Sequence, residues 1–193
     1  TRSDGTIYFT DPARRDSTGS PDLDLPFCGV FSVSPDLADI TLLLDELVLP
    51  NGLCFSPDER TLYVNDSMGI FRDPDNFRLS KGHTKAFDVH PDGTLSNGRV
   101  FSEMLSDLPG LPDGLKVDIA GNVYCAGAGG IWILSSSGKH LGTIITGAEQ
   151  TTNCGWGGDD WSTLFITTTE ALFKIQLQIA GIPVPALTGS LPQ

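Results

Sequence analysis

A turn-plus-strand pattern that recurs along the chain restricts the fold more than any other feature of the sequence. In each copy, a turn rich in Asp, Gly, Ser or Pro precedes a short run of β-branched and aromatic residues. Repeats of this kind are typical of β-propeller blades, whereas a β-sandwich does not repeat one motif in this way. The copies cover residues 4–10, 56–64, 118–125 and 159–167, and their marker residues Tyr8, Tyr63, Tyr124 and Phe165 lie 41–61 residues apart.

Short β-rich runs follow the copies, as partner strands of the same blades would. The 22 glycines and 13 prolines of the chain favour many short strands and turns over long helices. We interpret residues 42–49 as an outer strand with its connection, and we expect one helical turn within residues 101–108. The partner runs are residues 29–33, 85–89, 99–101, 130–134 and 171–175.

The number of copies predicts an incomplete propeller. About four blades are visible, whereas propellers have roughly 4–8 blades and close into a ring. The first copy begins almost at Thr1, with no preceding strand to complete its blade. We therefore treat residues 1–193 as a single partial all-β propeller domain, and we expect about two blades upstream of it.

Composition excludes several classes of function. The formal net charge of −12 repels nucleic-acid phosphates, and no apolar run is long enough to span a membrane. The four cysteines form no CxxC pair, so a zinc cluster and a disulfide framework are not indicated. Buried thiols fit a reducing compartment, so we expect a cytoplasmic protein, with periplasmic and secreted locations left open.

Two matched turns are the strongest candidates for a site. Residues 49–53 read Leu-Pro-Asn-Gly-Leu, and residues 111–115 read Leu-Pro-Asp-Gly-Leu. Each turn precedes a predicted innermost strand, so Asn51 and Asp113 are expected to meet at one mouth of the central channel. Carboxamide and carboxylate oxygens suit a hard cation such as Ca²⁺. In the next repeat, Thr152 or Asn153 is expected to face the same channel.

Other interpretations of these residues remain open. Asn-Gly and Asp-Gly are common turn dipeptides, so either pair can be a turn without a ligand. We interpret Asp66, at the end of another strand, as a turn cap. The sequence contains neither an HExxH zinc motif nor a GxSxG nucleophile elbow, which argues against a zinc hydrolase of that type and an α/β-hydrolase esterase.

Together, these segments resemble the gluconolactonase/regucalcin (senescence-marker-protein-like) family. The resemblance runs in order over nearly the whole chain. It rests on residues 4–12, 49–67, 86–101, 111–124 and 152–167.

The resemblance implies a six-bladed propeller with one divalent metal ion in its channel. The family holds this ion with a glutamate near the N-terminus and with an Asn and an Asp that correspond to Asn51 and Asp113. A further Asn of the family pattern, one blade earlier, and the glutamate are expected before Thr1. The chain therefore departs from the family pattern by N-terminal truncation. Ca²⁺ is the expected ion, with Zn²⁺, Mn²⁺ and Mg²⁺ as alternatives.

The implied function is that of a metal-dependent hydrolase that opens sugar lactones, a carboxylic ester hydrolase. The ion acts as a Lewis acid on the lactone carbonyl, and Asp113 serves as a ligand and as the base for water. One alternative is a non-catalytic calcium-binding propeller, because fold does not determine function. Another is a relative similar to strictosidine synthase or paraoxonase. The expected partner is a small lactone, and protein partners are left open.

Overall fold

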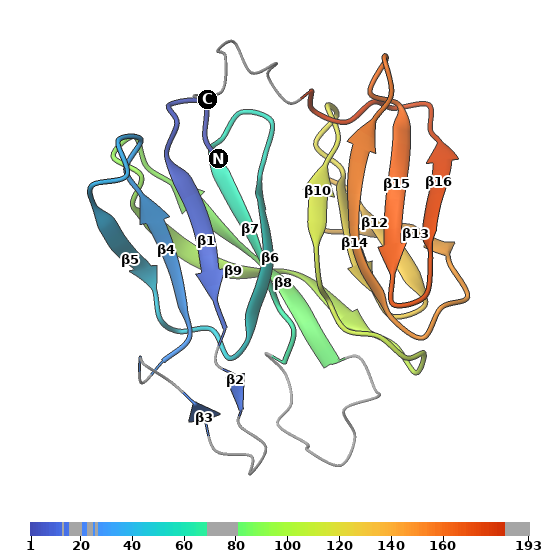
Figure 1. The fold of residues 1–193 in the computed structure, drawn as a ribbon, viewed down its shortest axis with the longest axis horizontal. Coiled ribbons are helices and arrows are strands. Elements are labelled where there is room, and N and C mark those ends of the chain that lie inside the picture. The colour runs from blue at the N-terminus through green and yellow to red at the C-terminus, as the bar shows by residue number, and fades with distance from the viewer. Residues whose placement is uncertain (13, 16–20, 23–24, 26, 69–80, 184–193) are drawn as a thin grey trace, which may run out of the picture.

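The described residues of the chain form five antiparallel sheets, four of which follow one another along the sequence (Figure 1). This computed structural model describes residues 1–193 apart from 13, 16–20, 23–24, 26, 69–80 and 184–193. The described residues contain strands and turns but no helix, and so they include no helix long and apolar enough to cross a membrane. The predicted all-β class is confirmed.

Each of the four main sheets has three or four strands. The first contains β1 (Ile7–Asp11), β4 (Gly29–Val33) and β5 (Ile40–Leu44). The second contains β6 (Pro50–Phe55), β7 (Thr61–Asp66), β8 (Lys81–Val89) and β9 (Leu95–Leu105). The third contains β10 (Leu115–Val117), β11 (Val123–Gly127), β12 (Gly130–Leu134) and β13 (His140–Ile145). The fourth contains β14 (Thr151–Gly157), β15 (Thr163–Thr168) and β16 (Leu172–Gln176), and a small hairpin pairs β2 (Arg14–Arg15) with β3 (Pro21–Asp22).

The predicted repeats correspond to these sheets one to one. The four copies become β1, β7, β11 and β15, and the predicted partner runs become β4, β8, β12 and β16. The outer strand predicted after residue 42 is β5, which ends at Leu44. The helical turn expected within residues 101–108 is wrong, because β9 continues to Leu105. The end of β9 pairs with β8, as far as Leu105 opposite Lys81. The backbone N–H and C=O groups that would bond within a helical turn are used in this pairing instead.

The turns that begin these strands owe their shape to short polar side chains. In the Ser-Pro-Asp turn at residues 56–60, the Ser56 hydroxyl donates to Asp58 at 2.7 Å, and Asp58 accepts from the Arg60 amide at 3.1 Å. Glu59 adopts a left-handed φ of 55°. The Ser34–Asp36 turn repeats this geometry, with Leu37 at a φ of 62°. Local hydrogen bonds of this type explain why the turns could be read from sequence.

Three hydrophobic clusters fill the spaces between neighbouring sheets. Each cluster combines side chains from two successive sheets. The first and second sheets pack together through Tyr8, Val30, Leu62, Val64 and Phe87. The second and third sheets pack through Tyr63, Met104, Leu115, Val123 and Leu134, and the third and fourth through Tyr124, Ile131, Cys154, Leu164 and Ile166.

The marker aromatics of the repeats face the following sheet in three of the four copies. Tyr8 packs edge-on against Phe55 at 4.9 Å, and Tyr124 packs edge-on against Trp156 at 5.1 Å. Phe165 occupies the corresponding place on β15 but is 37% exposed, because no later sheet covers it in the described part of the chain.

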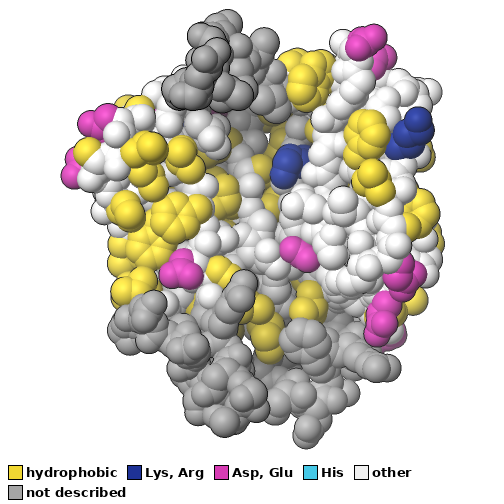
Figure 2. Space-filling model, in the orientation of Figure 1, with side chains coloured by type: hydrophobic (Ala, Val, Ile, Leu, Met, Phe, Trp, Pro, Cys, Tyr) yellow, Lys and Arg dark blue, Asp and Glu magenta, His cyan; other side chains and the backbone are white. Residues whose placement is uncertain are grey.

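The opposite face of the first sheet is apolar and also uncovered. Cross-strand pairing places six apolar side chains on this face, which we call the outer apolar face, and Phe9 and Phe31 stack there at 5.3 Å. Hydrophobic side chains gather over this sheet on the left of the space-filling view (Figure 2). Equivalent faces of the later sheets are buried against a preceding sheet. The face consists of Ile7, Phe9, Phe31, Val33, Ile40 and Leu42.

The innermost strands of the sheets lie next to one another. β6 packs beside β1 and β10, and β14 packs beside β10 and β11. This is a propeller-like succession of sheets. No described strand pairs the first sheet with the last, so the described residues do not form a closed ring. The six-bladed count remains a prediction.

The outer apolar face makes self-association of the isolated 193-residue chain a testable expectation. Exposed apolar surface and an open strand edge favour association. We expect oligomers in light scattering after size-exclusion chromatography, and we expect Ile40→Lys to reduce them. Ile145→Lys is the matched control, because both isoleucines lie on outer strands and are 68% and 67% exposed. A monomeric wild-type chain would contradict this expectation.

Candidate active site

The two matched turns lie side by side on neighbouring innermost strands. The Gly52 amide donates to the Asp113 carbonyl oxygen at 3.2 Å, and the Thr10 hydroxyl donates to the Asn51 carbonyl oxygen at 2.8 Å. Asp113 precedes β10, as predicted. Asn51 does not precede its strand but lies within β6, at a register shift between Pro50 and Leu53. The backbone itself therefore joins the two turns.

Close packing, and not a special turn conformation, accounts for the glycine in each motif. Neither Gly52 nor Gly114 adopts a positive φ. A Cβ atom at Gly52 would lie 2.3 Å from the Asp113 carbonyl oxygen. A Cβ atom at Gly114 would lie 2.1 Å from the Asn153 side chain. Each glycine therefore lets the next innermost strand approach.

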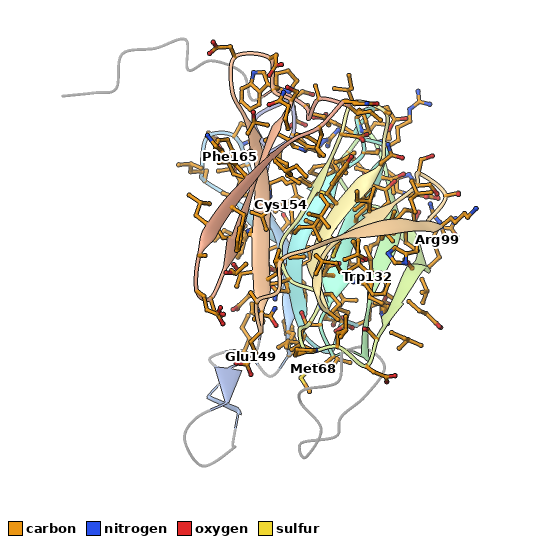
Figure 3. All side chains as sticks on the ribbon, turned by 90° about the vertical axis from the view of Figure 1, so that its right-hand side faces the viewer. Met68, Arg99, Trp132, Glu149, Cys154 and Phe165 are labelled. Atoms are coloured by element: carbon orange, nitrogen blue, oxygen red, sulfur yellow. The ribbon has the colours of Figure 1, made fainter. Side chains whose placement is uncertain are left out.

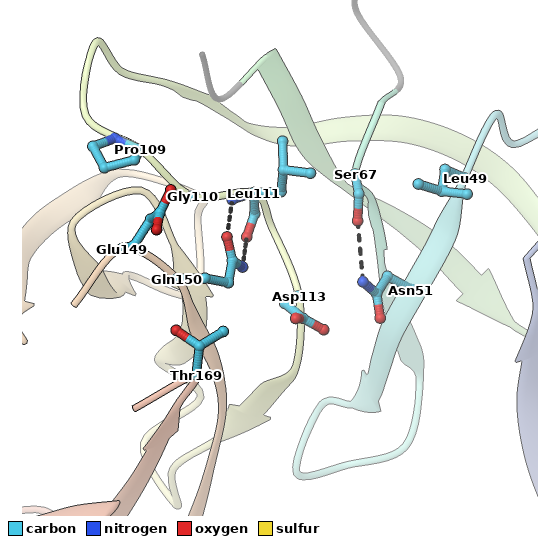
Figure 4. Close-up of a pocket in the computed structure, with 10 residues that line it drawn as sticks. All are labelled: Leu49, Asn51, Ser67, Pro109, Gly110, Leu111, Asp113, Glu149, Gln150 and Thr169. Atoms are coloured by element: carbon cyan, nitrogen blue, oxygen red, sulfur yellow. Dashed lines mark hydrogen bonds between the residues drawn. The ribbon is translucent and has the colours of Figure 1, made fainter. Parts of the chain in front are cut away.

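Asn51 and Asp113 line one pocket, with a cavity volume of about 500 Å³. Its wall comes from the second, third and fourth sheets (Figure 4). Figure 3 shows Glu149 and Met68 at the end of the molecule where this pocket lies. Among the described residues, no Lys or Arg lines it. The lining consists of Leu49, Asn51, Ser67, Pro109, Gly110, Leu111, Asp113, Glu149, Gln150 and Thr169.

The Asp113 carboxylate points across the pocket toward Asn51 (Figure 4). Burial raises the pKa of this carboxyl above its usual range. Hydrogen bonding from the side chains of Asn51 and Gln150 and from the Gly114 amide lowers the pKa by less. The group is thus partly desolvated while its ionised form keeps polar partners, as a carboxylate that accepts a proton requires.

Gln150 fixes the second turn from the fourth sheet. Its Oε1 accepts from the Leu111 amide at 3.2 Å, and its Nε2 donates to the Leu111 carbonyl oxygen at 3.3 Å (Figure 4). The sequence pointed instead to Thr152 and Asn153. Neither lines the pocket: Thr152 bonds to Thr167 on β15, and Asn153 packs against Gly114.

A set of buried polar side chains from the second sheet supports both turns. Asn65 donates to the Asp113 carbonyl oxygen at 2.6 Å, and the Thr84 hydroxyl donates to the Asn65 side-chain oxygen at 2.7 Å. The carboxylate of Asp66 accepts from the amides of Val48 at 3.0 Å and Leu49 at 2.8 Å. The capping role predicted for Asp66 is confirmed. The roles of Asn65 and Thr84 were not predicted, because each becomes apparent only when two sheets are packed together.

The donor set of the pocket suits a hard cation. The side-chain nitrogen of Asn51, Nδ2, donates to the Ser67 hydroxyl at 3.3 Å. This leaves the side-chain oxygen Oδ1 available, and Asp113 adds a carboxylate. In the part of the chain that the structure describes, no thiol or imidazole lines the pocket. Nowhere in the described ranges do three His, Cys, Asp or Glu side chains form a metal-binding cluster. Two protein oxygens are fewer than the 6–8 ligands that Ca²⁺ takes, so other ligands are needed.

Residues 1–170 match the protein family described as the SMP-30/Gluconolactonase/LRE-like region. The chain belongs to this family. The resemblance seen in the sequence is therefore confirmed. A gluconolactonase of Zymomonas mobilis is 30% identical over 189 residues, which cover 92% of this chain and 49% of that protein.

Two solved structures extend the comparison. A gluconolactonase from Xanthomonas campestris has a TM-score of 0.72 and 34% identity, covering 91% of this chain and 55% of that one. A regucalcin from Agrobacterium tumefaciens, described as a calcium-binding protein, has a TM-score of 0.69 and 18% identity, covering 93% and 60%. This second likeness shows the fold alone. The chain spans about half the length of the gluconolactonases it matches.

The close approach of the two turns predicts a large cost for Gly52→Ala. The added Cβ would meet backbone atoms that cannot move aside, so we expect a loss of about 1–3 kcal/mol in the free energy of unfolding, as for other overpacked sites. Gly155→Ala is the matched control, because Gly155 also lies in an innermost strand and has nothing within 4 Å of its Cβ position. Urea unfolding of both variants measures the difference. Equal stabilities would contradict the packing role.

The raised pKa of Asp113 predicts a pH-dependent cost to stability. Its folded-state pKa lies above the ordinary value of 3.8, so the folded chain binds the proton more tightly than the unfolded chain. This contribution to stability is present below pH 3.8 and is lost as pH rises through the folded-state pKa. In chelator at pH 7, Asp113→Asn should therefore unfold at a higher temperature than wild type. The gain should shrink as pH approaches 3.8, and a lower unfolding temperature at pH 7 would contradict it.

Proposed function

We propose that this chain carries the Asn51–Asp113 part of the metal site of a sugar-lactone hydrolase, similar to gluconolactonase. The observation that supports this most directly is the pairing of a carboxamide and a carboxylate at adjacent innermost strands, in one pocket whose described lining has no Lys or Arg. Membership of a family with relatives named gluconolactonase supports the same reaction class. The remaining metal ligands would come from the part of the protein that precedes this chain.

Asn51 and Asp113 would hold the ion through the Asn51 side-chain oxygen Oδ1 and the Asp113 carboxylate. Oxygen donors of this kind favour Ca²⁺, and they also accept Mg²⁺, Mn²⁺ or Zn²⁺. When bound, a divalent ion supplies Lewis-acid polarisation of a carbonyl and positive charge near a developing oxyanion. The choice of ion is a prediction, as is the cytoplasmic location.

Asp113 is proposed as the base of the reaction. In this role its carboxylate accepts a proton from the water that attacks the lactone carbonyl. The bond between the carbonyl carbon and the ring oxygen then breaks, and the ring oxygen takes up that proton to become a hydroxyl group of the acid product. A partly buried carboxyl with a raised pKa is a better proton acceptor than a fully solvated one. Gln150 and Asn51 keep the carboxylate oriented toward the pocket.

The pocket suits a small polyhydroxylated substrate. Its volume of about 500 Å³ lies within the range of roughly 300–1,000 Å³ that is usual for small-molecule sites. Glu149, Gln150 and Thr169 offer hydrogen-bonding groups on the wall opposite Asn51 (Figure 4). Hydroxyl groups of a sugar lactone would bind there, while its carbonyl lies near Asp113.

Lactone hydrolysis by the full-length protein tests the proposal. We expect activity on aldonolactones that a chelator abolishes and added Ca²⁺ or another divalent ion restores. Asp113→Asn should lower kcat by about 10²–10⁴-fold, the usual contribution of a general base. The assay follows acid release with a pH indicator.

Asp160→Asn serves as the control, because Asp160 lies in an exposed turn of the fourth sheet and does not line the pocket. It should leave kcat unchanged. Activity that survives in Asp113→Asn would rule out the proposed base. Calcium binding without any lactonase activity would favour a non-catalytic calcium-binding propeller.

A further inference from the structure

The hydroxyl of Ser67 lies between the two turns of the site. Ser67 directly follows β7 and is 1% exposed. Its Oγ donates to the Pro112 carbonyl oxygen, in the second turn, and accepts from Asn51 Nδ2 at 3.3 Å, in the first. Its amide also donates to the Leu49 carbonyl oxygen at 3.0 Å. A single residue thus contacts both turns by three hydrogen bonds.

The direction of these bonds follows from the number of protons. A serine hydroxyl has one proton, and the Pro112 carbonyl oxygen is able only to accept it. The bond between Ser67 and Asn51 must therefore use a proton of the Asn51 amide nitrogen. The side-chain oxygen of Asn51, Oδ1, then lies on the side away from Ser67, toward the pocket (Figure 4).

The orientation of this carboxamide decides whether Asn51 is able to bind a cation. Its two ends are nearly equal in size, but only the oxygen carries a lone pair for a metal ion. Asn65 and Thr84 fix the backbone of the second turn. Asn51 Nδ2 has two protons: one is donated to Ser67 Oγ at 3.3 Å, and the other serves the hydrogen bond from this side chain to the Asp113 carboxylate.

We propose that Ser67 is a positioning residue that fixes the Asn51 carboxamide with its oxygen toward the cation and couples it to the Asp113 turn. This inference rests on the proposed function, because it assigns a supporting role within that metal site. Ser67 acts through Asn51 and through the Pro112 carbonyl.

Calcium affinity of the full-length protein tests the proposal by calorimetry with Ca²⁺ alone. Ser67→Ala should weaken Ca²⁺ binding by about 10–100-fold, the usual effect of removing a partner that orients a metal ligand. Ser162→Ala is the matched control, because Ser162 is also a buried serine that accepts a side-chain hydrogen bond, from Gln176, and lies outside the pocket. It should bind Ca²⁺ as wild type does. Ser67→Ala with wild-type affinity would overturn the proposal.

A second background separates positioning from general damage to the fold. In Asn51→Asp both side-chain oxygens are able to bind a cation, so the orientation of the group no longer matters. Adding Ser67→Ala to Asn51→Asp should change Ca²⁺ affinity by no more than about twofold, the limit expected for uncoupled sites. If the full 10–100-fold loss persists in this background, Ser67 acts through the fold and the proposal is wrong.

Ser67→Cys provides a variant of nearly the same size if Ser67→Ala does not fold. A thiol is a weaker donor and acceptor than a hydroxyl, so an affinity between those of wild type and Ser67→Ala is expected. An affinity equal to that of wild type would count against the role of the hydroxyl. A full-length protein that binds Ca²⁺ but opens no lactone contradicts the proposed function alone, whereas one that binds no divalent ion contradicts both.

Discussion

The backbone hydrogen bond from Gly52 to Asp113 is the contact on which the geometry of the candidate site depends. It joins the innermost strands of the second and third sheets, which also share a hydrophobic cluster, and it forms because Gly52 has no Cβ atom to hold the strands apart. Gly114 lets the fourth sheet approach the third in the same way. The side chains beside these glycines, Asn51 and Asp113, are thereby brought to one pocket.

The packing of each sheet between two neighbours explains why the first and last sheets have uncovered faces. In the second sheet, β7 buries Leu62 and Val64 against the preceding sheet and Tyr63 against the following one. In the third sheet, β11 buries Val123 and Tyr124 in the same way. The first sheet leaves its Ile7 face exposed, and the fourth leaves Phe165 exposed. The exposed face of the first sheet is apolar throughout, as a buried surface is. Together with the coverage of about half of related gluconolactonases, this supports the proposal that further sheets complete the site.

Local chemistry made much of this fold predictable from sequence. Turns such as Ser56–Arg60 are specified by side chains within a few residues, and strands such as β4 and β12 coincide with their β-rich runs. Asn51 and Asp113 were found because their motifs match each other. Contacts between sheets were harder to predict. Ser67, Asn65 and Gln150 carry no motif of their own, and their roles arise from partners 16–48 residues away.

A crystal structure of the full-length protein with bound Ca²⁺ tests the central claim most directly. We predict one ion with the Asn51 side-chain oxygen Oδ1 and an Asp113 carboxylate oxygen both at about 2.3–2.6 Å, the usual calcium–oxygen distances. The Asn51 amide nitrogen should still point to Ser67. An ion bound elsewhere, or an Asn51 side chain turned away from it, would contradict the claim that these neighbouring turns form one cation site.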